Sequence, residues 1–273
     1  MTKNFIKESL SGWGGFPKKI AKVFYPVKIN QILNVIKNGE VIARGNGRAY
    51  GDSAISEKNT INMKNFNNIL AFDENNGILT IEAGVLLSDI IKTFLPRGWF
   101  PHVTPGSKYV TVGGMIAADV HGKNHHKDGS FGNFVEWIDV IDHDGKINRC
   151  SKRENEELFE WTIGGMGLTG IIIRAAIKLR TVETCWIKQK TLTAKNIDET
   201  LEIFKSSMNS TYSVAWLNCS VKNKNIGQSL IMLGEHAALN ELKSKDKSTP
   251  LKLIKKKKIY IPFYLPNWFL NKW

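Results

Sequence analysis

Hydrophobic and polar residues alternate between helical and extended patterns in the first part of the chain. Apolar residues recur at helical spacing over 29–36 and again over 86–95. Short apolar runs predict strands over 69–72 and 78–83. Residues 75–77, Asn-Asn-Gly, lie between these runs and are typical of a hairpin turn, which excludes a purely parallel sheet.

The middle of the chain continues this mixed pattern. Residues 135–140 and 171–173 have the apolar runs of buried strands. Ser151 and Glu154 have the spacing of a capping box, which predicts a short helix that continues through Trp161.

The pattern changes after about residue 184, where glycine becomes sparse. Asn196 and Glu199 cap a predicted helix, and the strands predicted around this helix cover 186–192, 212–219 and 229–234. We therefore place a domain boundary near residue 183, with one domain over 1–183 and a second over 184–273. The mixture of helices, hairpins and buried strands indicates the α+β class.

Composition restricts the class of protein. The chain has 273 residues, of which 42% are hydrophobic and 23% charged, enough for a sizeable core and unlike a disordered chain. The formal net charge of +13 favours anionic partners, although a lysine-rich background would give the same value. No signal peptide or membrane-spanning run is visible, which favours the cytoplasm. Three widely spaced cysteines indicate buried thiols in a reducing compartment.

A glycine-rich stretch, ARGNGRAYGDS over 43–53, follows the apolar run 41–43. Its glycines allow the backbone to approach a ligand, and its N–H groups and arginines suit phosphate. The third glycine misses the dinucleotide-binding fingerprint by one residue, and no Gly-Lys-Ser or Gly-Lys-Thr follows. Taken alone, the stretch could equally be a surface turn.

A second informative stretch covers 105–133. It has small apolar residues over 112–118 and then His121-Gly122-Lys123-Asn124-His125-His126. His121 and His125 have metal-ligand spacing, but no cysteine or carboxylate completes a set, so we expect no metal. A polar loop at a small-molecule site fits better. A third glycine cluster covers 164–170.

Three stretches in order resemble one family of flavoenzymes. They are ARGNGRAYGDS, PGSKYVTVGGMIAADVHGKNHHKDGSFGN and LFEWTIGGMGLTGIIIRAAIKL. Together they resemble the FAD-linked oxidases of the vanillyl-alcohol oxidase / p-cresol methylhydroxylase superfamily. The stretch from His121 to Asn133 resembles the decaprenylphosphoryl-ribose 2-oxidase branch, and the similarity extends from residue 11 to the end of the chain.

The resemblance implies a two-subdomain FAD-binding domain of the p-cresol methylhydroxylase type, followed by an α/β substrate (cap) domain. It implies that the loop of 43–53 wraps the FAD pyrophosphate and that residues of the later stretches line the cofactor. The FAD-binding residues implied in this way are Ala43, Arg44, Gly45, Asn46, Gly47, Arg48, Ala49, Tyr50, Gly51, Asp52, Ser53, Gly106, Thr111, Val112, Gly113, Gly114, Ala118, Asp119, Val120, His121 and Ile173.

The reaction implied is hydride transfer from a sugar carbinol carbon to flavin N5, which gives a keto sugar. His121 is implied to lie near the reacting edge of the flavin. Trp13, Lys123, Asn124 and His125 are candidates to face the substrate, and each could equally be a packing residue of its loop. A separate ketoreductase is the implied partner, and the electron acceptor is left open.

The chain departs from the family pattern at two points. Several members attach FAD through a histidine at the position of Arg48, so we predict non-covalent FAD. Relatives are longer at the C-terminus, where the nearest ones carry an active-site lysine and tyrosine. We therefore expect an incomplete cap domain and a general base outside this chain.

Other functions stay open. The substrate could be a polyprenyl-phosphate pentose or a soluble sugar, alditol or aldonolactone. A truncated, non-catalytic flavin-binding module and a basic nucleic-acid-binding protein are further alternatives, but aromatics placed for RNA binding are not seen. Lys255, Lys256, Lys257 and Lys258 could form a solvated loop or a peripheral membrane contact with the aromatic residues that follow them.

Overall fold

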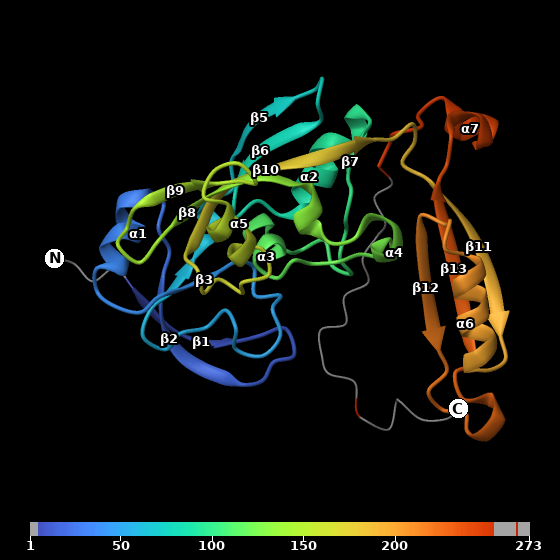
Figure 1. The fold of residues 1–273 in the computed structure, drawn as a ribbon, viewed down its shortest axis with the longest axis horizontal. Coiled ribbons are helices and arrows are strands. Elements are labelled where there is room, and N and C mark those ends of the chain that lie inside the picture. The colour runs from blue at the N-terminus through green and yellow to red at the C-terminus, as the bar shows by residue number, and fades with distance from the viewer. Residues whose placement is uncertain (1–4, 254–265, 267–273) are drawn as a thin grey trace.

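The computed structural model describes residues 5–253 and residue 266. Its helices and strands form an N-terminal part, residues 5–181, and a C-terminal part, residues 187–253, which lie side by side (Figure 1). The predicted membrane contact at Lys255–Lys258 falls outside the described residues.

The first sheet of the N-terminal part has four strands in the order β1-β2-β4-β3. β1 and β2 form an antiparallel hairpin, whereas β4 is parallel to both β2 and β3. The apolar face of α1 packs on this sheet through Ile32 and Val35, which meet Ile61 of β4. The bounds are Ile6–Ser11 for β1, Lys18–Phe24 for β2, Ile42–Arg44 for β3, Thr60–Asn62 for β4 and Ile29–Ile36 for α1.

The second sheet has the order β5-β6-β10-β8-β9, and β7 pairs with β10. The predicted hairpin around 75–77 is confirmed as β5 and β6, which are antiparallel. The predicted helix over 86–95 is confirmed as α2, followed by the 3-10 turn η2. The bounds are Ile69–Asp73 (β5), Ile78–Glu82 (β6), Trp99–Pro101 (β7), Val135–Ile141 (β8), Ile147–Cys150 (β9), Ile171–Thr181 (β10), Leu87–Phe94 (α2) and Leu95–Arg97 (η2).

Strand β10 connects the two cores of the N-terminal part. Its side chains contact both cores, and an irregularity between Ile172 and Arg174 interrupts the simple alternation of a strand. Ile171 and Ile173 pack with α1, while Ile172, Ala175 and Ile177 pack in the larger core with the helices. Helices α3 (Val112–Ala117) and α5 (Glu156–Thr162) cover that core. The remaining short elements are η1 (Met63–Asn65), α4 (His125–Asp128) and η3 (Phe131–Phe134).

The predicted capping box at Ser151 and Glu154 is wrong. The helix α5 begins at Glu156 after Asn155, which has left-handed backbone angles and no side-chain capping bond. The Ser151 hydroxyl instead accepts hydrogen bonds from the backbone N–H groups of Arg153 and Glu154. The serine therefore closes a tight turn after β9, because a hydroxyl can stabilise a turn as well as a helix start.

The C-terminal part has a three-stranded antiparallel sheet of order β11-β13-β12. Helix α6 packs on one face through Ile203 and Phe204. The cap predicted at its start is confirmed, because the Asn196 side chain accepts a bond from the Glu199 N–H (2.9 Å). The bounds are Ile187–Ala194 (β11), Ile197–Ser206 (α6), Tyr212–Leu217 (β12), Asn223–Asn225 (η4), Ser229–His236 (β13), Leu239–Glu241 (η5) and Ser244–Lys247 (α7).

One expectation from the sequence about the cysteines is revised by the structure. All three cysteines are free thiols, but only Cys150 is buried and Cys219 is exposed, so the expectation of buried thiols is wrong for Cys219.

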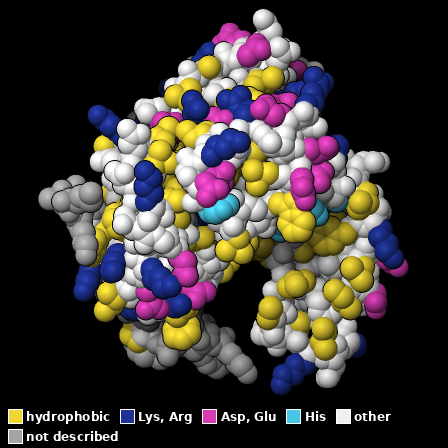
Figure 2. Space-filling view, turned by 60° about the vertical axis from the view of Figure 1, so that its left-hand side comes forward, with side chains coloured by type: hydrophobic (Ala, Val, Ile, Leu, Met, Phe, Trp, Pro, Cys, Tyr) yellow, Lys and Arg dark blue, Asp and Glu magenta, His cyan; other side chains and the backbone are white. Residues whose placement is uncertain are grey.

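Lys and Arg side chains are scattered over the face shown in Figure 2 rather than gathered in one patch. No helix among the described residues is long and apolar enough to cross a membrane.

A buried polar junction anchors the loop that carries α4. The Asn124 side chain is fully buried and donates to the His102 carbonyl (2.7 Å) and to Asp128 Oδ2 (2.6 Å). The Arg180 guanidinium, at the end of β10, also binds Asp128. Against the cost of burial, these two donors hold the pKa of Asp128 below its usual value. The junction therefore ties this loop to the neighbouring backbone and to β10.

The same loop contacts the C-terminal part through three residues. The Lys123 carbonyl accepts from the Ser213 N–H of β12 (2.9 Å). Next to it, His126 Nε2 lies 2.7 Å from the Ser210 carbonyl, and Lys127 donates to the Asn209 carbonyl at 3.2 Å. The loop thus connects the two parts of the molecule.

We expect His102 to make the free energy of unfolding depend on pH. Burial, followed by the charge of Arg180, lowers the pKa of His102 from 6.5 to about 4. The unfolded chain therefore binds a proton that the folded chain does not, and stability falls as the pH drops through this range. Urea unfolding of the intact protein should lose on the order of 1 kcal/mol per pH unit from this group.

The variant His102→Phe keeps a ring that can stack on Phe134, as His102 does at 4.0 Å between ring centroids. Its stability should fall less steeply with acid than that of the wild type. Burial also lowers the pKa of His236, so a smaller slope should remain. His143→Asn, at an exposed position, is the matched control and should keep the wild-type slope. Equal slopes for His102→Phe and wild type would contradict the interpretation.

Candidate functional site

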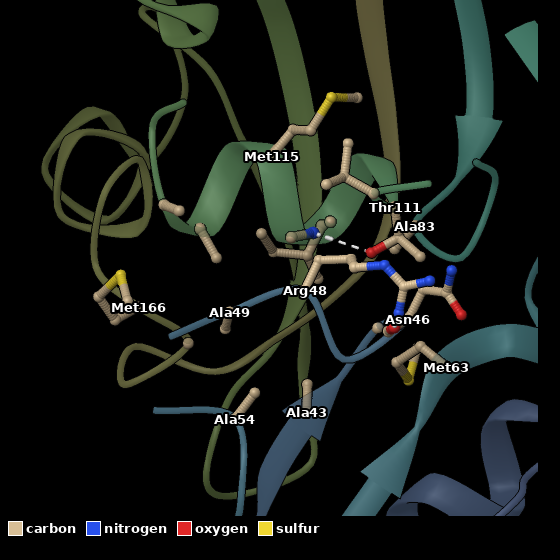
Figure 3. A pocket seen from close by; sticks show the side chains of 18 of the residues that line it. Ala43, Asn46, Arg48, Ala49, Ala54, Met63, Ala83, Thr111, Met115 and Met166 are labelled. Carbon is tan, nitrogen blue, oxygen red and sulfur yellow. Dashed lines mark hydrogen bonds between the residues drawn. The ribbon is translucent and has the colours of Figure 1, made fainter. Parts of the chain in front are cut away.

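An open cavity of about 920 Å³, mouth included, lies between the glycine-rich loop and α3 (Figure 3). The loop after β3 forms one wall, α3 forms another, and the third glycine cluster with the start of β10 closes it. The three stretches singled out by sequence therefore meet around one space. The predicted residues that line it are Ala43, Gly45, Asn46, Gly47, Arg48, Ala49, Ser53, Thr111, Gly113, Gly114, Ala118 and Val120.

Close approach between the loop and the start of α3 explains why glycine occupies position 45. A Cβ atom added to Gly45 would lie 2.2 Å from Thr111 Oγ1, which no real contact allows. Thr111 itself caps α3, because its hydroxyl accepts a hydrogen bond from the Gly114 N–H (3.3 Å; dashed in Figure 3). One threonine thus holds the helix start and sets the distance to the loop.

A buried arginine fixes the loop from behind. Arg44 is 8% exposed and donates to the carbonyl oxygens of Ser11 (2.8 Å) and Ala54 (3.4 Å). Burial lowers the pKa of Arg44, but a guanidinium keeps its proton in proteins. Gly47 has φ of +67°, and a Cβ atom there would meet the Arg44 guanidinium at 2.6 Å. Arg44 therefore shapes the loop without lining the cavity.

Unpaired donors remain on the cavity side of the loop. Within the described part of the chain, the backbone N–H groups of Asn46, Gly47, Arg48 and Ala49 donate no hydrogen bond. The Arg48 Nε atom is buried and also has no partner. Figure 3 shows the side chains of Arg48 and Asn46 next to each other at this wall. A buried donor without a partner, such as Arg48 Nε, is costly, and together with the free N–H groups of the loop it suits an anion such as a phosphate.

The opposite wall is nearly free of side chains. Gly113 donates its N–H to the Ala83 carbonyl (2.8 Å), and a Cβ atom on it would lie 3.0 Å from Ala83 Cβ. Gly114, Ala117 and Ala118 continue this surface along α3. A flat aromatic group could lie against such a wall, because Gly113, Gly114, Ala117 and Ala118 have little or no side chain.

Several residues predicted to bind FAD lie outside the cavity lining. Val112 is buried in the larger core, and Ile173 is buried against α1 on the other face of β10. Asp119 instead accepts from the Gly132 N–H at 2.8 Å. The predicted residues that do not line the cavity are Arg44, Tyr50, Gly51, Asp52, Gly106, Val112, Asp119, His121 and Ile173.

The candidate substrate residues have different surroundings. Trp13 is 56% exposed and lies under the Arg48 guanidinium, 4.8 Å from the ring centroid. Lys123 and His125 are exposed, and the His125 ring contacts that of His121 edge-on at 5.2 Å. Asn124 is fully buried, so its side chain belongs to the junction described above. Among the described residues, no group of three or more His, Cys, Asp or Glu is placed to hold a metal ion.

Other lining residues were not among the predicted site residues. Met166, Gly167 and Gly170 belong to the third glycine cluster, whose sequence already stood out. Met63 and Ala83 lie at the ends of β4 and β6, where no motif marks them. The remaining ones are Ala54, Val110, Met115, Ala117 and Ile172.

Comparisons with known proteins indicate which cofactor the chain binds. Residues 20–151 match the family described as an FAD binding domain. The chain is also 36% identical to the decaprenylphosphoryl-β-D-ribose oxidase of Mycolicibacterium smegmatis, over 96% of this chain and 59% of the relative. The chain therefore contains an FAD-binding domain similar to those of FAD-linked oxidases. Its unpaired donors and smooth wall fit the pyrophosphate and the flat rings of FAD.

More distant relatives have different activities. Cytokinin dehydrogenase 2 of Arabidopsis thaliana is 30% identical over 55% of this chain and 31% of the relative. L-Gulonolactone oxidase of Mus musculus is 25% identical over 57% of this chain and 36% of the relative. The chain spans about three fifths of the length of the mycobacterial relative and less of these two.

Replacing Gly45 by alanine should weaken FAD binding. The added Cβ would meet the Thr111 hydroxyl and push the loop away from α3. Titration of the apoprotein with FAD, followed by flavin fluorescence, should show about tenfold weaker affinity or more, equal to about 1.4 kcal/mol.

Gly14→Ala is the matched control, because a Cβ there has no neighbour within 4 Å, and it should bind FAD normally. In the double variant with Thr111→Ala, part of the lost affinity should return, since the clashing hydroxyl is gone. Normal FAD affinity in Gly45→Ala would show that the close approach does not shape the site.

Proposed function

We propose that the chain binds FAD without a covalent bond. Arg48 occupies the position at which the resemblance implies a histidine link in several family members, and its guanidinium cannot form that link. The side chain is instead hydrogen-bonded to the Asn46 carbonyl (2.7 Å) and stacked over Trp13. Its charge would lie against the pyrophosphate, which needs compensation when it leaves water.

Acid precipitation of the purified protein tests this proposal. The yellow flavin bands should leave with the supernatant, because denaturation breaks the loop that holds FAD. Arg48→Gln should bind FAD more weakly, since it removes a charge beside the phosphates, whereas Arg153→Gln at an exposed turn should not. Flavin that stays in the pellet would show a covalent link.

The reaction proposed is oxidation of a secondary alcohol of a sugar to a ketone. The substrate class is a polyprenyl-phosphate pentose, and the 36% identity to a decaprenylphosphoryl-ribose oxidase over nearly the whole chain supports it. FAD supplies the oxidising power by accepting a hydride from the substrate carbon. The oxidation would give a keto sugar for a separate ketoreductase.

In this proposal the residues of the chain bind and orient rather than react. The loop of 43–54 holds the phosphates, and the wall of α3 positions the flat ring system. The loop 121–127, which the buried Asn124 side chain anchors, would carry His121 and Lys123 as the residues that contact the sugar. We assign the general base to no residue of this chain.

Anaerobic mixing with candidate substrates is the experiment that tests the reaction. The flavin absorbance should bleach with a polyprenylphosphoryl ribose and not with the free pentose, because the proposed substrate carries the lipid phosphate. Bleaching by an aldonolactone or alditol instead would favour a soluble substrate, as the similarity to L-gulonolactone oxidase suggests.

Dithionite reduction of the same sample serves as the control for a competent flavin. A protein that dithionite bleaches and no sugar bleaches would be a flavin-binding module without this activity. A colourless protein that cannot be reconstituted with FAD would contradict the whole proposal.

A further inference from the structure

The outer face of the N-terminal hairpin has no role in the cavity. In β2, Ala21 and Val23 are buried. Lys18, Ile20 and Lys22 lie on the opposite face of the strand and are exposed. Strand β1 lies at the edge of its sheet, at the lower margin of the N-terminal part in Figure 1. The outer hairpin face consists of Lys7, Ser9, Ser11, Lys18, Ile20 and Lys22.

The charges on this face are not neutralised by neighbouring described residues. Lys7 lies directly opposite Lys22, and like charges in such a pair destabilise a sheet. The acidic side chains nearby have other partners. Glu8 accepts from the Tyr25 hydroxyl at 2.8 Å, and Asp52 and Glu57 both pair with Lys19, at 3.0 and 3.8 Å. The face therefore keeps an uncompensated positive charge at a cost to the hairpin.

Large apolar side chains accompany these lysines. Ile20, in the middle of the face, is 69% exposed, and Phe16, in the turn between β1 and β2, is 82% exposed. A basic surface with a projecting apolar tip is the combination that holds proteins at an anionic membrane, since either signal alone binds weakly. Nucleic acid is a poorer fit, because the outer hairpin face has no arginine and its central side chain, Ile20, cannot stack on bases.

We propose that the outer hairpin face docks on the surface of an anionic lipid bilayer. Lys7, Lys18 and Lys22 contact the headgroups, while Phe16 and Ile20 enter the interfacial layer. The turn of the hairpin also touches the cavity loop, because the Trp13 N–H donates to the Ala49 carbonyl at 2.8 Å. Docking in this way brings the rim of the cavity close to the bilayer. The docking proposal does not depend on which sugar is oxidised.

Vesicle co-sedimentation of the full FAD-loaded chain tests the proposal. The vesicles contain equal parts of phosphatidylcholine and phosphatidylglycerol, and phosphatidylcholine alone is the neutral comparison. The variant Lys7→Gln/Lys18→Gln/Lys22→Gln should lose roughly a hundredfold in partitioning, at about fivefold per lysine. Phe16→Ala should remove most of the binding that survives in high salt, since salt screens only the charges.

A variant with the same charge change elsewhere is the matched control. Lys190→Gln/Lys205→Gln/Lys224→Gln alters exposed lysines of the C-terminal part and should bind like wild type. Circular dichroism and flavin content check that each variant is folded and loaded.

Four results would overturn the proposal. The first is unchanged vesicle binding of the hairpin variant, and the second is an equal loss of vesicle binding in both triple variants. The third is a loss of vesicle binding only when Lys255–Lys258 are changed to Gln. The fourth is a hairpin variant that loses DNA binding while its vesicle binding stays. Equal binding to neutral vesicles would also remove the electrostatic part of the argument.

Discussion

The approach of the Gly45 backbone to the Thr111 side chain determines the geometry of the cavity. No Cβ atom fits between them, so the loop can lie against the start of α3 only with glycine at this position. The Thr111 hydroxyl also caps α3 through Gly114. Both walls of the cavity are therefore positioned by the same residue.

Charge is arranged around this contact in two layers. Arg44 lies behind the loop, where carbonyl oxygens accept its hydrogen bonds and burial lowers its pKa. Arg48 and the free N–H groups of the loop lie at the cavity. Arg44 therefore fixes the backbone of the loop, whereas Arg48 and the free N–H groups leave donors available for a ligand. This division explains why two arginines only four positions apart have different roles.

The loop that carries α4 gives the molecule its second organising feature. The buried Asn124 binds Asp128, which binds Arg180 of β10, and the backbone of the loop meets β12 through Lys123. Residues proposed to face the substrate thus lie on a segment held by both parts of the chain. A displacement of the C-terminal part would act on Lys123 directly, because its carbonyl accepts the Ser213 N–H.

Local sequence signals by themselves determined much of the fold. The Asn-Asn-Gly hairpin and the Asn196 cap form as predicted, because turn and cap residues act on backbone within a few positions. Ser151 misled the prediction, since a serine can close a turn as easily as start a helix. The three glycine-rich stretches also indicated the cavity, because glycine is required where another group approaches the backbone closely.

Only the tertiary structure decided which side chains line the site. Ile172 and Ile173 both belong to a buried strand, and the alternation of a strand does not say which face holds the ligand when both faces are covered. Met63 and Ala83 line the cavity because two strands end there, an outcome of packing between distant segments. Likewise, the pattern of β2 shows an exposed lysine face, but its register with β1 and the missing acidic partners exist only in the folded sheet.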